Sequence, residues 1–331
     1  MSRTSRRTFL STLGATALAG GCRSTTGREP LILRLSHSMT PGVTSLHAFS
    51  QLFKEHAERA TAGAVTIRIF PSGTLGQERE VVQQVQEGLV DFMVSGTAIW
   101  SSVAPRLGIF DFPFMWRGWP HIHSVVDGRV GHEAGEYLAS TVRMRPLAWG
   151  DSFGFRHVVT RLREVTEMGQ LAGLKIRTIQ SAIYVKTIEL MGASPTPMAF
   201  GEVYTSLQTG VIDGYEHDAN TTVQQRFFEV AGYMARTAHI AGVVGLWAST
   251  TIFDTLPAEI RDALQRAALE AAAQQRAMGH REETDAMAQL GQRGMTIHDV
   301  DRRPLLPAAE RLWESEARQL GTTPWLEAIR A

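Results

Sequence analysis

The sequence predicts an α/β protein of two lobes, with a ligand cleft between the lobes and one long helix that braces both. Three observations support this fold class. The chain has 331 residues, which exceeds one typical domain. Segments with strand and helix periodicity alternate along most of its length, as in α/β proteins. Residues 257–290 form one helical run, roughly 45 Å long at about 1.5 Å per residue, which is longer than one lobe needs.

The alternation also predicts the order of the elements. Strands of the first lobe are expected at 31–35, 65–69, 89–94 and 147–149. Helices are expected between them over 46–57, ending before Gly63, from near Glu78 through Val85, and at about 121–142. Strands of the second lobe are expected at 153–159, 174–177, near 194 and at 211–215. Residues 234–248 should return the chain to the first lobe. We therefore assign 30–152 and 243–282 to the first lobe, and 153–242 and 283–331 to the second.

Composition indicates an ordinary soluble globular protein. Hydrophobic residues make up 44% of the chain, charged residues make up 20%, and the formal net charge is zero. This balance gives no indication of nucleic-acid binding.

The N-terminus is typical of an exported protein. Residues 1–22 contain the twin-arginine pattern Ser5-Arg6-Arg7-Thr8-Phe9-Leu10, followed by an apolar run too short to span a bilayer. Cys22, the only cysteine, follows Leu18-Ala19-Gly20-Gly21 as in a bacterial lipobox, and it is therefore a candidate for lipidation. Cleavage after Ala19 is the alternative. We expect a periplasmic protein that is either free or lipid-anchored.

Two arginines on neighbouring predicted strands suggest an anion site. Arg177 ends the alternating segment Leu174-Lys175-Ile176-Arg177, and Arg156 belongs to the strand at 153–159. A planar guanidinium suits bidentate recognition of a carboxylate. Either arginine alone would more often be a surface residue or the partner of a structural acid.

Further polar residues are predicted at the ends of elements on the cleft side. His37 follows the first strand, Glu78 begins a helix, Gly96 follows the third strand, and His217 follows the strand at 211–215. In α/β sheets, ligands bind outside the carboxyl ends of strands. Because no nucleophile with its base, metal cluster or cofactor cradle accompanies these residues, the pattern favours binding over catalysis, with no cofactor and no metal.

One motif points to a different class. Gly150-Asp151-Ser152-Phe153-Gly154 matches the nucleophile elbow of serine hydrolases, which would make Ser152 a nucleophile. That elbow requires a helix after the serine, whereas an alternating strand is predicted here. His121 and His123 are two residues apart on a predicted helix, so they do not share a face for a metal.

Several longer motifs then carry a family resemblance. They are Phe70-Pro71-Ser72-Gly73-Thr74-Leu75-Gly76, Gly173-Leu174-Lys175-Ile176-Arg177, the run from Gly192 to Phe200, and Leu207-Gln208-Thr209-Gly210-Val211-Ile212-Asp213-Gly214. In this order they closely resemble the extracytoplasmic solute-binding subunits of TRAP transporters, the DctP-like family. The resemblance covers nearly all of the chain after the N-terminal segment.

The resemblance implies a periplasmic binding protein fold that closes over an organic acid. It also implies delivery of that acid to a membrane permease of one small and one large subunit, driven by a sodium gradient, without enzymatic activity. Arg177 is expected to pair with the ligand carboxylate, with Arg156 as a second contact. The other implied pocket positions are His37, Glu78, Gly96, Gln180, Phe200 and His217, and we add Tyr215 and Glu216, which precede His217.

This chain also departs from the family pattern. Sialic-acid binders of the family have asparagine at the positions of His37 and His217 and an acid at that of Gly96, so sialic acid is disfavoured. We expect a hydroxylated monocarboxylate such as a uronate or aldonate, or else a C4-dicarboxylate whose second carboxylate meets Arg156. A periplasmic serine hydrolase using Ser152 and a binding protein of an ABC transporter are the remaining alternatives.

Overall fold

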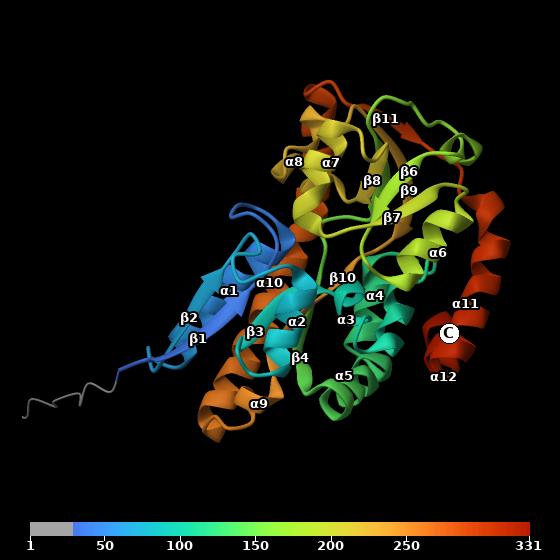
Figure 1. Cartoon of the computed structure of the whole chain (residues 1–331). Helices are drawn as coiled ribbons and strands as arrows, with labels where there is room; N and C mark the ends of the chain where they lie inside the picture. The colour runs from blue at the N-terminus through green and yellow to red at the C-terminus, as the bar shows by residue number, and fades with distance from the viewer. Residues whose placement is uncertain (1–28) are drawn as a thin grey trace, which may run out of the picture.

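The computed structural model describes residues 29–331, which form two β-sheets joined by crossing segments and flanked by helices (Figure 1). The predicted α/β class and the long helix are confirmed. The export pattern and Cys22 lie outside the described residues.

The first sheet has five strands in the order β2-β1-β3-β10-β4. Strands β1, β2 and β3 run parallel, and β10 lies antiparallel to both β3 and β4. The strands are β1 (Leu31–Ser36), β2 (Val65–Phe70), β3 (Phe92–Gly96), β4 (Met144–Asp151) and β10 (Val243–Ser249).

The second sheet has six strands in the order β11-β9-β5-β8-β6-β7. Strands β8, β6 and β7 run parallel to one another, whereas β5 is antiparallel to β8 and to β9. The strands are β5 (Arg156–Thr160), β6 (Lys175–Thr178), β7 (Ser194–Pro197), β8 (Gly214–His217), β9 (Tyr233–Ile240) and β11 (Thr296–Asp299).

Helices follow from apolar residues at helical spacing. In α1 (Ser45–Ala60), Phe49, Phe53 and Ala57 lie four residues apart and are fully buried against Leu33 and Leu35 of β1. The other α-helices are α2 (Glu78–Gln86), α3 (Thr97–Trp100), α4 (Trp119–Val126), α5 (Arg129–Val142), α6 (Ala182–Leu190), α7 (Val203–Thr209), α8 (Ala219–Gln224), α9 (Thr250–Phe253), α10 (Ala258–Gln292), α11 (Leu306–Leu320) and α12 (Thr323–Arg330).

The single helix predicted over 121–142 is wrong. It is two helices, α4 and α5, separated at Asp127 and Gly128. A side chain at position 128 would place its Cβ 2.5 Å from the carbonyl oxygen of Ser124, so only glycine allows the chain to turn this closely.

Three segments connect the two sheets: the link from β4 to β5, the link from β9 to β10, and α10. Residues in the first half of α10 pack into the core of the first sheet, and Ala286 and Leu290 pack into a core of the second. The helix therefore braces both halves (Figure 1).

Two buried side chains form hydrogen bonds between these connecting segments. Gln275 of α10 accepts a hydrogen bond from the amide of Asp151 at 3.1 Å and donates one to its carbonyl at 2.6 Å. The hydroxyl of Ser152 lies 2.8 Å from the carbonyl oxygen of Gly154 and 2.6 Å from that of Ala241. These contacts join α10 and both links at one level of the molecule.

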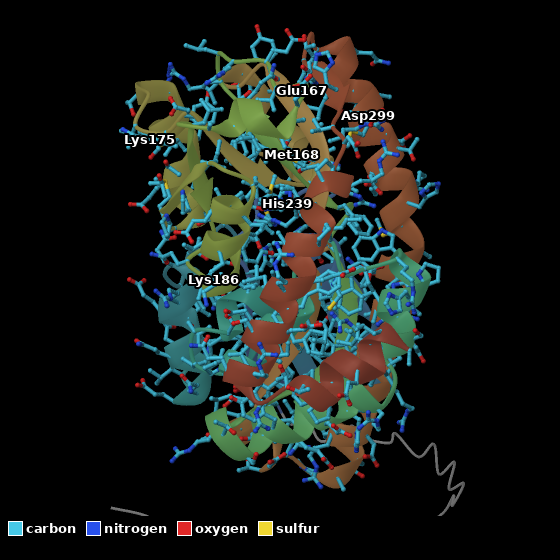
Figure 2. All side chains as sticks on the ribbon, turned by 90° about the vertical axis from the view of Figure 1, so that its right-hand side faces the viewer. Glu167, Met168, Lys175, Lys186, His239 and Asp299 are labelled. Carbon is cyan, nitrogen blue, oxygen red and sulfur yellow. The ribbon has the colours of Figure 1, made fainter. Side chains whose placement is uncertain are left out.

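After β11 the chain returns toward the first sheet. Trp325 of α12 donates its indole N–H to Glu133 of α5 at 2.7 Å, and Trp313 of α11 donates to the carbonyl of Pro113 at 2.8 Å. Figure 2 looks onto the face that carries α11 and α12, with Lys175 and Asp299 in the half that contains the second sheet. The residue boundaries of the two lobes stay a prediction. That prediction assigns α11 and α12 to the second lobe, but these helices pack largely against helices that flank the first sheet.

None of the helices within residues 29–331 combines the length and the apolar character needed to cross a bilayer.

Gln275→Ala should destabilise the protein by about 1–3 kcal/mol, because it leaves the buried amide and carbonyl of Asp151 without these partners. Urea denaturation followed by circular dichroism would measure the change. Gln274→Ala, at the exposed neighbouring position, is the matched control. Equal stability of the two variants would show that the hydrogen bonds of Gln275 contribute nothing to the free energy of unfolding.

Candidate functional site

A cleft lies where the two sheets face each other, and it is lined from both sides. From the first half come Ser38, Glu78, Gly96 and Asp111, and from the second half come Arg156, Arg177, Tyr184, Phe200, His217 and Asp218. Six predicted site residues thus meet at one cleft: Arg177, Arg156, Glu78, Gly96, Phe200 and His217.

Arg177 presents a cation to the cleft without an acidic partner. Its Nε and one terminal nitrogen donate to the carbonyl oxygen of Met198 at 3.2 and 2.8 Å, which fixes the plane of the guanidinium. Within residues 29–331, no carboxylate forms an ion pair with it. Burial, together with the nearby cation of Arg156, lowers the pKa of Arg177 to about 10, so the group stays charged at neutral pH.

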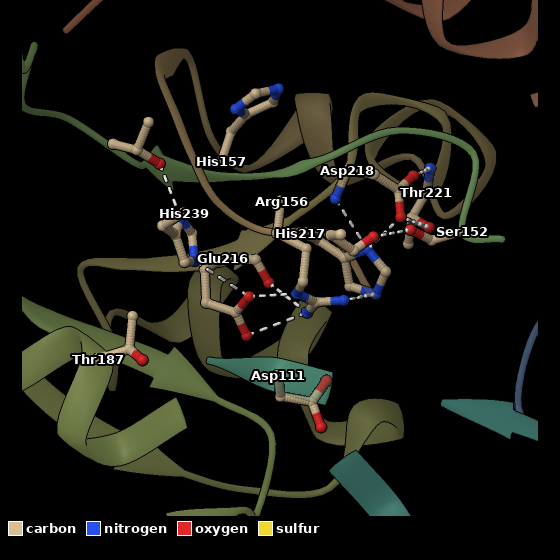
Figure 3. Close-up of polar contacts among 12 residues, drawn as sticks. Asp111, Ser152, Arg156, His157, Thr187, Glu216, His217, Asp218, Thr221 and His239 are labelled. Atoms are coloured by element: carbon tan, nitrogen blue, oxygen red, sulfur yellow. Dashed lines mark hydrogen bonds and ion pairs between the residues drawn. The ribbon is translucent and has the colours of Figure 1, made fainter. Parts of the chain in front are cut away.

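Arg156, in contrast, is occupied by protein groups (Figure 3). Its Nε donates to one carboxylate oxygen of Glu216, and a terminal nitrogen lies 3.0 Å from the other and 2.9 Å from the Glu216 carbonyl. The second terminal nitrogen lies 3.4 Å from Nε2 of His217. All three nitrogens of this guanidinium therefore have a partner in the protein.

The charges of Arg156 and Glu216 balance, because each residue stabilises the charged form of the other. Burial is the largest single influence and would raise the pKa of Glu216, but the Arg156 guanidinium and His239 together outweigh it and lower this pKa to about 2. Burial favours neutral Arg156, yet Glu216 raises its pKa above the ordinary value. The pair contributes almost no net charge to the cleft.

His217 and Asp218 continue this network toward α8. Nδ1 of His217 lies 2.8 Å from the Asp218 carboxylate, and Asp218 caps α8 by accepting from the amide of Thr221 at 2.7 Å. Burial and the Arg156 cation lower the pKa of His217, so its imidazole is neutral. A neutral ring can exchange hydrogen bonds with a ligand without adding charge.

The opposite wall carries two carboxyl groups. Glu78, at the first position of α2, accepts a hydrogen bond from the Ser38 hydroxyl at 3.0 Å, and burial raises its pKa. Asp111 is 1% exposed, and burial raises its pKa to about 7. Sequence reasoning missed Asp111, although an acid between two aromatic residues, Phe110 and Phe112, was a signal.

Four predicted site residues do not line the cleft. Tyr215 is fully buried in a core, where its hydroxyl donates to Thr222 at 2.9 Å. The ring of His37 lies against His47, with 3.1 Å between their nitrogens, and burial followed by the effect of His47 lowers its pKa to about 3. Gln180 is partly exposed and does not line the cleft, and Glu216 acts through Arg156.

Ser152 is not a nucleophile elbow. It follows β4 and precedes β5, a strand rather than a helix, and its hydroxyl is engaged by the two carbonyl oxygens described above. A serine that donates to carbonyls has no general base to activate it. Among residues 29–331, moreover, no group of three or more histidine, cysteine or acidic side chains could hold a metal ion.

Comparison with known proteins extends this description. Residues 35–319 match the family model DctP, described as bacterial extracellular solute-binding protein, family 7. The 2,3-diketo-L-gulonate-binding periplasmic protein of Escherichia coli is 31% identical over 265 residues, which is 80% of each chain.

Solved structures share the fold over almost the whole described chain. A TRAP periplasmic solute-binding protein from Roseobacter denitrificans, with bound β-D-glucuronate, has a TM-score of 0.86 at 26% identity, covering 91% of this chain and 99% of that one. A similar protein from Polaromonas, bound to D-erythronate, has a TM-score of 0.86 at 28% identity, covering 91% and 98%.

The family match leaves the hydrolase and ABC-transporter alternatives without support. The chain belongs to the DctP family of bacterial extracellular solute-binding proteins, family 7, and is a solute-binding protein of the TRAP type.

Proposed function

We propose that this protein binds a hydroxylated monocarboxylate, such as a uronate or an aldonate, with the ligand carboxylate on Arg177. The observation that carries this proposal is the difference between the two arginines. Arg177 faces the cleft without an ion-pair partner among residues 29–331, whereas Arg156 is paired with Glu216. A buried guanidinium lacking a counter-ion attracts one carboxylate, and its fixed plane suits two parallel hydrogen bonds.

The same difference disfavours a C4-dicarboxylate. A second carboxylate would need Arg156, but Glu216 already balances the charge of that arginine, and only the terminal nitrogen that lies 3.4 Å from His217 could reach a ligand while the pair stays intact. The second carboxylate would also approach Glu78 or Asp111 on the opposite wall. Acids found in similar proteins, β-D-glucuronate and D-erythronate, support a ligand with one carboxylate and several hydroxyls.

The remaining cleft residues suit such hydroxyls. Glu78 and Ser38 offer an acceptor and a hydroxyl from the first half, and neutral His217 lines the cleft from the second, where its Nε2 makes only a long contact of 3.4 Å to Arg156. Phe200 lies half-buried with its ring centre 5.9 Å from the Arg177 guanidinium carbon, so it can cover the apolar face of a sugar acid.

Contacts from both halves also link binding to closure. A ligand held by Arg177 on one side and by Glu78 on the other has more partners when the halves approach each other. Only such differential contact shifts the population toward the closed state. We propose that the closed, loaded form is what the small and large membrane subunits of a TRAP permease recognise.

Export completes the proposal. The twin-arginine pattern favours secretion of the folded chain to the periplasm, with Cys22 lipidated or with cleavage after Ala19. Mass spectrometry of the mature N-terminus would distinguish the two.

Thermal-shift screening of the mature protein tests the function itself. After bound ligand has been stripped by unfolding and refolding, uronates, aldonates, C4-dicarboxylates and aromatic acids are added separately. A ligand that binds only the native state raises Tm, by an amount that grows with concentration over Kd. A shift with a uronate or aldonate supports the proposal, a larger shift with a C4-dicarboxylate contradicts the ligand class, and silence of the whole panel contradicts organic-acid binding.

Arg177→Lys should weaken binding of the acid identified in this way by about 2 kcal/mol or more, roughly 30-fold, because it keeps the charge but loses the fork. Isothermal titration calorimetry measures the change. Arg311→Lys, on the exposed face of α11, is the matched control. Unchanged affinity in Arg177→Lys would remove this arginine from the site.

Glu216→Gln should release Arg156 for a second carboxylate. We expect at least a tenfold gain in succinate affinity relative to the monocarboxylate, with a loss of about 3 kcal/mol in unfolding free energy from breaking the buried pair. Because Arg156 keeps the pKa of Glu216 below its ordinary value, this stability difference is present above about pH 4.5 and is lost as pH falls toward 2.

Calorimetry and urea denaturation provide the two measurements for Glu216→Gln. Glu189→Gln, an exposed carboxylate on α6, serves as control. If the variant binds succinate no better than the wild type does, the pairing of Arg156 does not determine the ligand class.

A further inference from the structure

Asp111 is a second carboxyl group, besides Glu78, that faces the cleft. The pairing of Arg156 with Glu216 and the open position of Arg177 do not explain its role. Asp111 ends the 3-10 helix Pro105–Asp111 and lines the cleft from the first half, while being almost completely buried. In Figure 3 it lies beside the Arg156 network without a line joining it to any residue of that network.

Asp111 keeps hydrogen-bonding capacity for a ligand. Within residues 29–331 the Thr97 hydroxyl lies 3.0 Å from each carboxylate oxygen, and the Tyr184 hydroxyl is a second, weaker donor to the same group. A hydroxyl has one hydrogen and can donate to only one oxygen at a time. A carboxylate has about four acceptor sites, so these two hydroxyls leave sites in a buried group that a ligand donor can fill.

The charged groups around Asp111 do not occupy its remaining acceptor sites. The elements packed around Asp111 present Thr97 from α3, Arg156 from β5, Tyr184 from α6 and Glu216 from β8. The nitrogens of Arg156 already bind Glu216 and His217. Burial is the largest influence, and it raises the pKa of Asp111 to about 7 even though Arg156 favours the charged form.

We propose that Asp111 is a specificity-determining residue that accepts a hydrogen bond from a ligand hydroxyl and excludes a second carboxylate from this end of the cleft. The inference rests on the proposed function, since it places the ligand carboxylate at Arg177 and the ligand hydroxyls toward the first half.

Two physical effects would give Asp111 this selectivity. A site built to bind a hydroxyl rejects an analogue without it strongly, because the buried acceptor is then left unpaired. A carboxylate at the same place adds like-charge repulsion in a buried environment. Asp111 would thus select both for a hydroxyl and against a second acid.

Asp111→Asn tests this with two linear six-carbon probes, D-gluconate and D-glucarate, which differ only in whether the far end is a hydroxymethyl group or a carboxylate. By calorimetry the wild type should prefer D-gluconate at least tenfold. The variant should bind D-gluconate about tenfold more weakly, and its preference over D-glucarate should shrink, since the negative charge that repels a second carboxylate is removed. Asp285→Asn, at an exposed position of α10, should change neither affinity.

The outcomes separate this inference from the proposed function. If the acid panel gives a hit but the wild type binds D-glucarate as tightly as D-gluconate, or binds neither, the inference is overturned alone. An unchanged preference in Asp111→Asn overturns it in the same way. Silence of the entire panel overturns the proposed function as well.

A ligand-free measurement distinguishes recognition from a structural role. Because burial disfavours the charged carboxylate, Asp111→Asn should fold and raise Tm by about 2–4 °C. Since the folded-state pKa lies above the unfolded one, protonation stabilises wild-type protein at low pH, and this stabilisation is lost as pH rises through about 7. The gain in Tm should therefore be larger at pH 8 than at pH 5.

A lower Tm for Asp111→Asn at both pH values would show that Asp111 is a structural residue, and it would overturn the inference. Asp111→Ser, which is small and uncharged, is the second variant. It should show the same shift in probe preference without the amide donor, so the binding result does not depend on one substitution folding well.

Discussion

The buried pair between Arg156 and Glu216 sets the electrostatics of the whole cleft. The two residues come from adjacent antiparallel strands, β5 and β8, so the backbone pairing of the second sheet holds them in register. Their charges cancel, His217 is kept neutral beside them, and His239 lies 3.6 Å from the Glu216 carboxylate on the far side. Arg177 is left as the cation available to a ligand carboxylate among the described cleft residues. A buried ion pair adds little stability on balance, but here it determines how many charges a ligand can carry.

The segments that connect the two halves of the molecule meet at one level. Gln275 and Ser152 join the long helix to both crossing strands directly behind the cleft, and Ser152, Gly242 and Val243 also line it. A movement that brings the acidic wall of Glu78 and Asp111 toward Arg177 must therefore pass through these hydrogen-bonded links. Ser152 has a physical reason to be present that does not involve catalysis: its hydroxyl donates to one of two nearby carbonyl groups, of Ala241 or of Gly154, where sheet pairing is interrupted.

Periodicity predicted most of the fold and the central part of the candidate site. Alternation of Leu174 and Ile176 located the strand that carries Arg177, and helical spacing located the long helix. Residues whose position depends on tertiary contacts were not predictable. His37 does follow β1, but its ring turns to His47. Neighbouring residues of β8 point to opposite faces, so Tyr215 lies in a core and Glu216 lies beside Arg156, and neither lines the cleft. Asp111 reaches the cleft from a 3-10 segment whose path is set by the packing of its aromatic neighbours. Such a path leaves no regular spacing of apolar residues in the sequence, so periodicity could not predict it.

The central claim is that the ligand carboxylate binds Arg177 while Arg156 remains with Glu216. A crystal structure of the protein with the tightest acid of the panel tests this most directly. The account predicts two parallel hydrogen bonds of about 2.7–2.9 Å from the Arg177 guanidinium to one carboxylate, with the Arg156–Glu216 pair unchanged and a ligand hydroxyl on Asp111. A carboxylate bound to Arg156 with Glu216 displaced, or a ligand that leaves Arg177 without an anion, would contradict it.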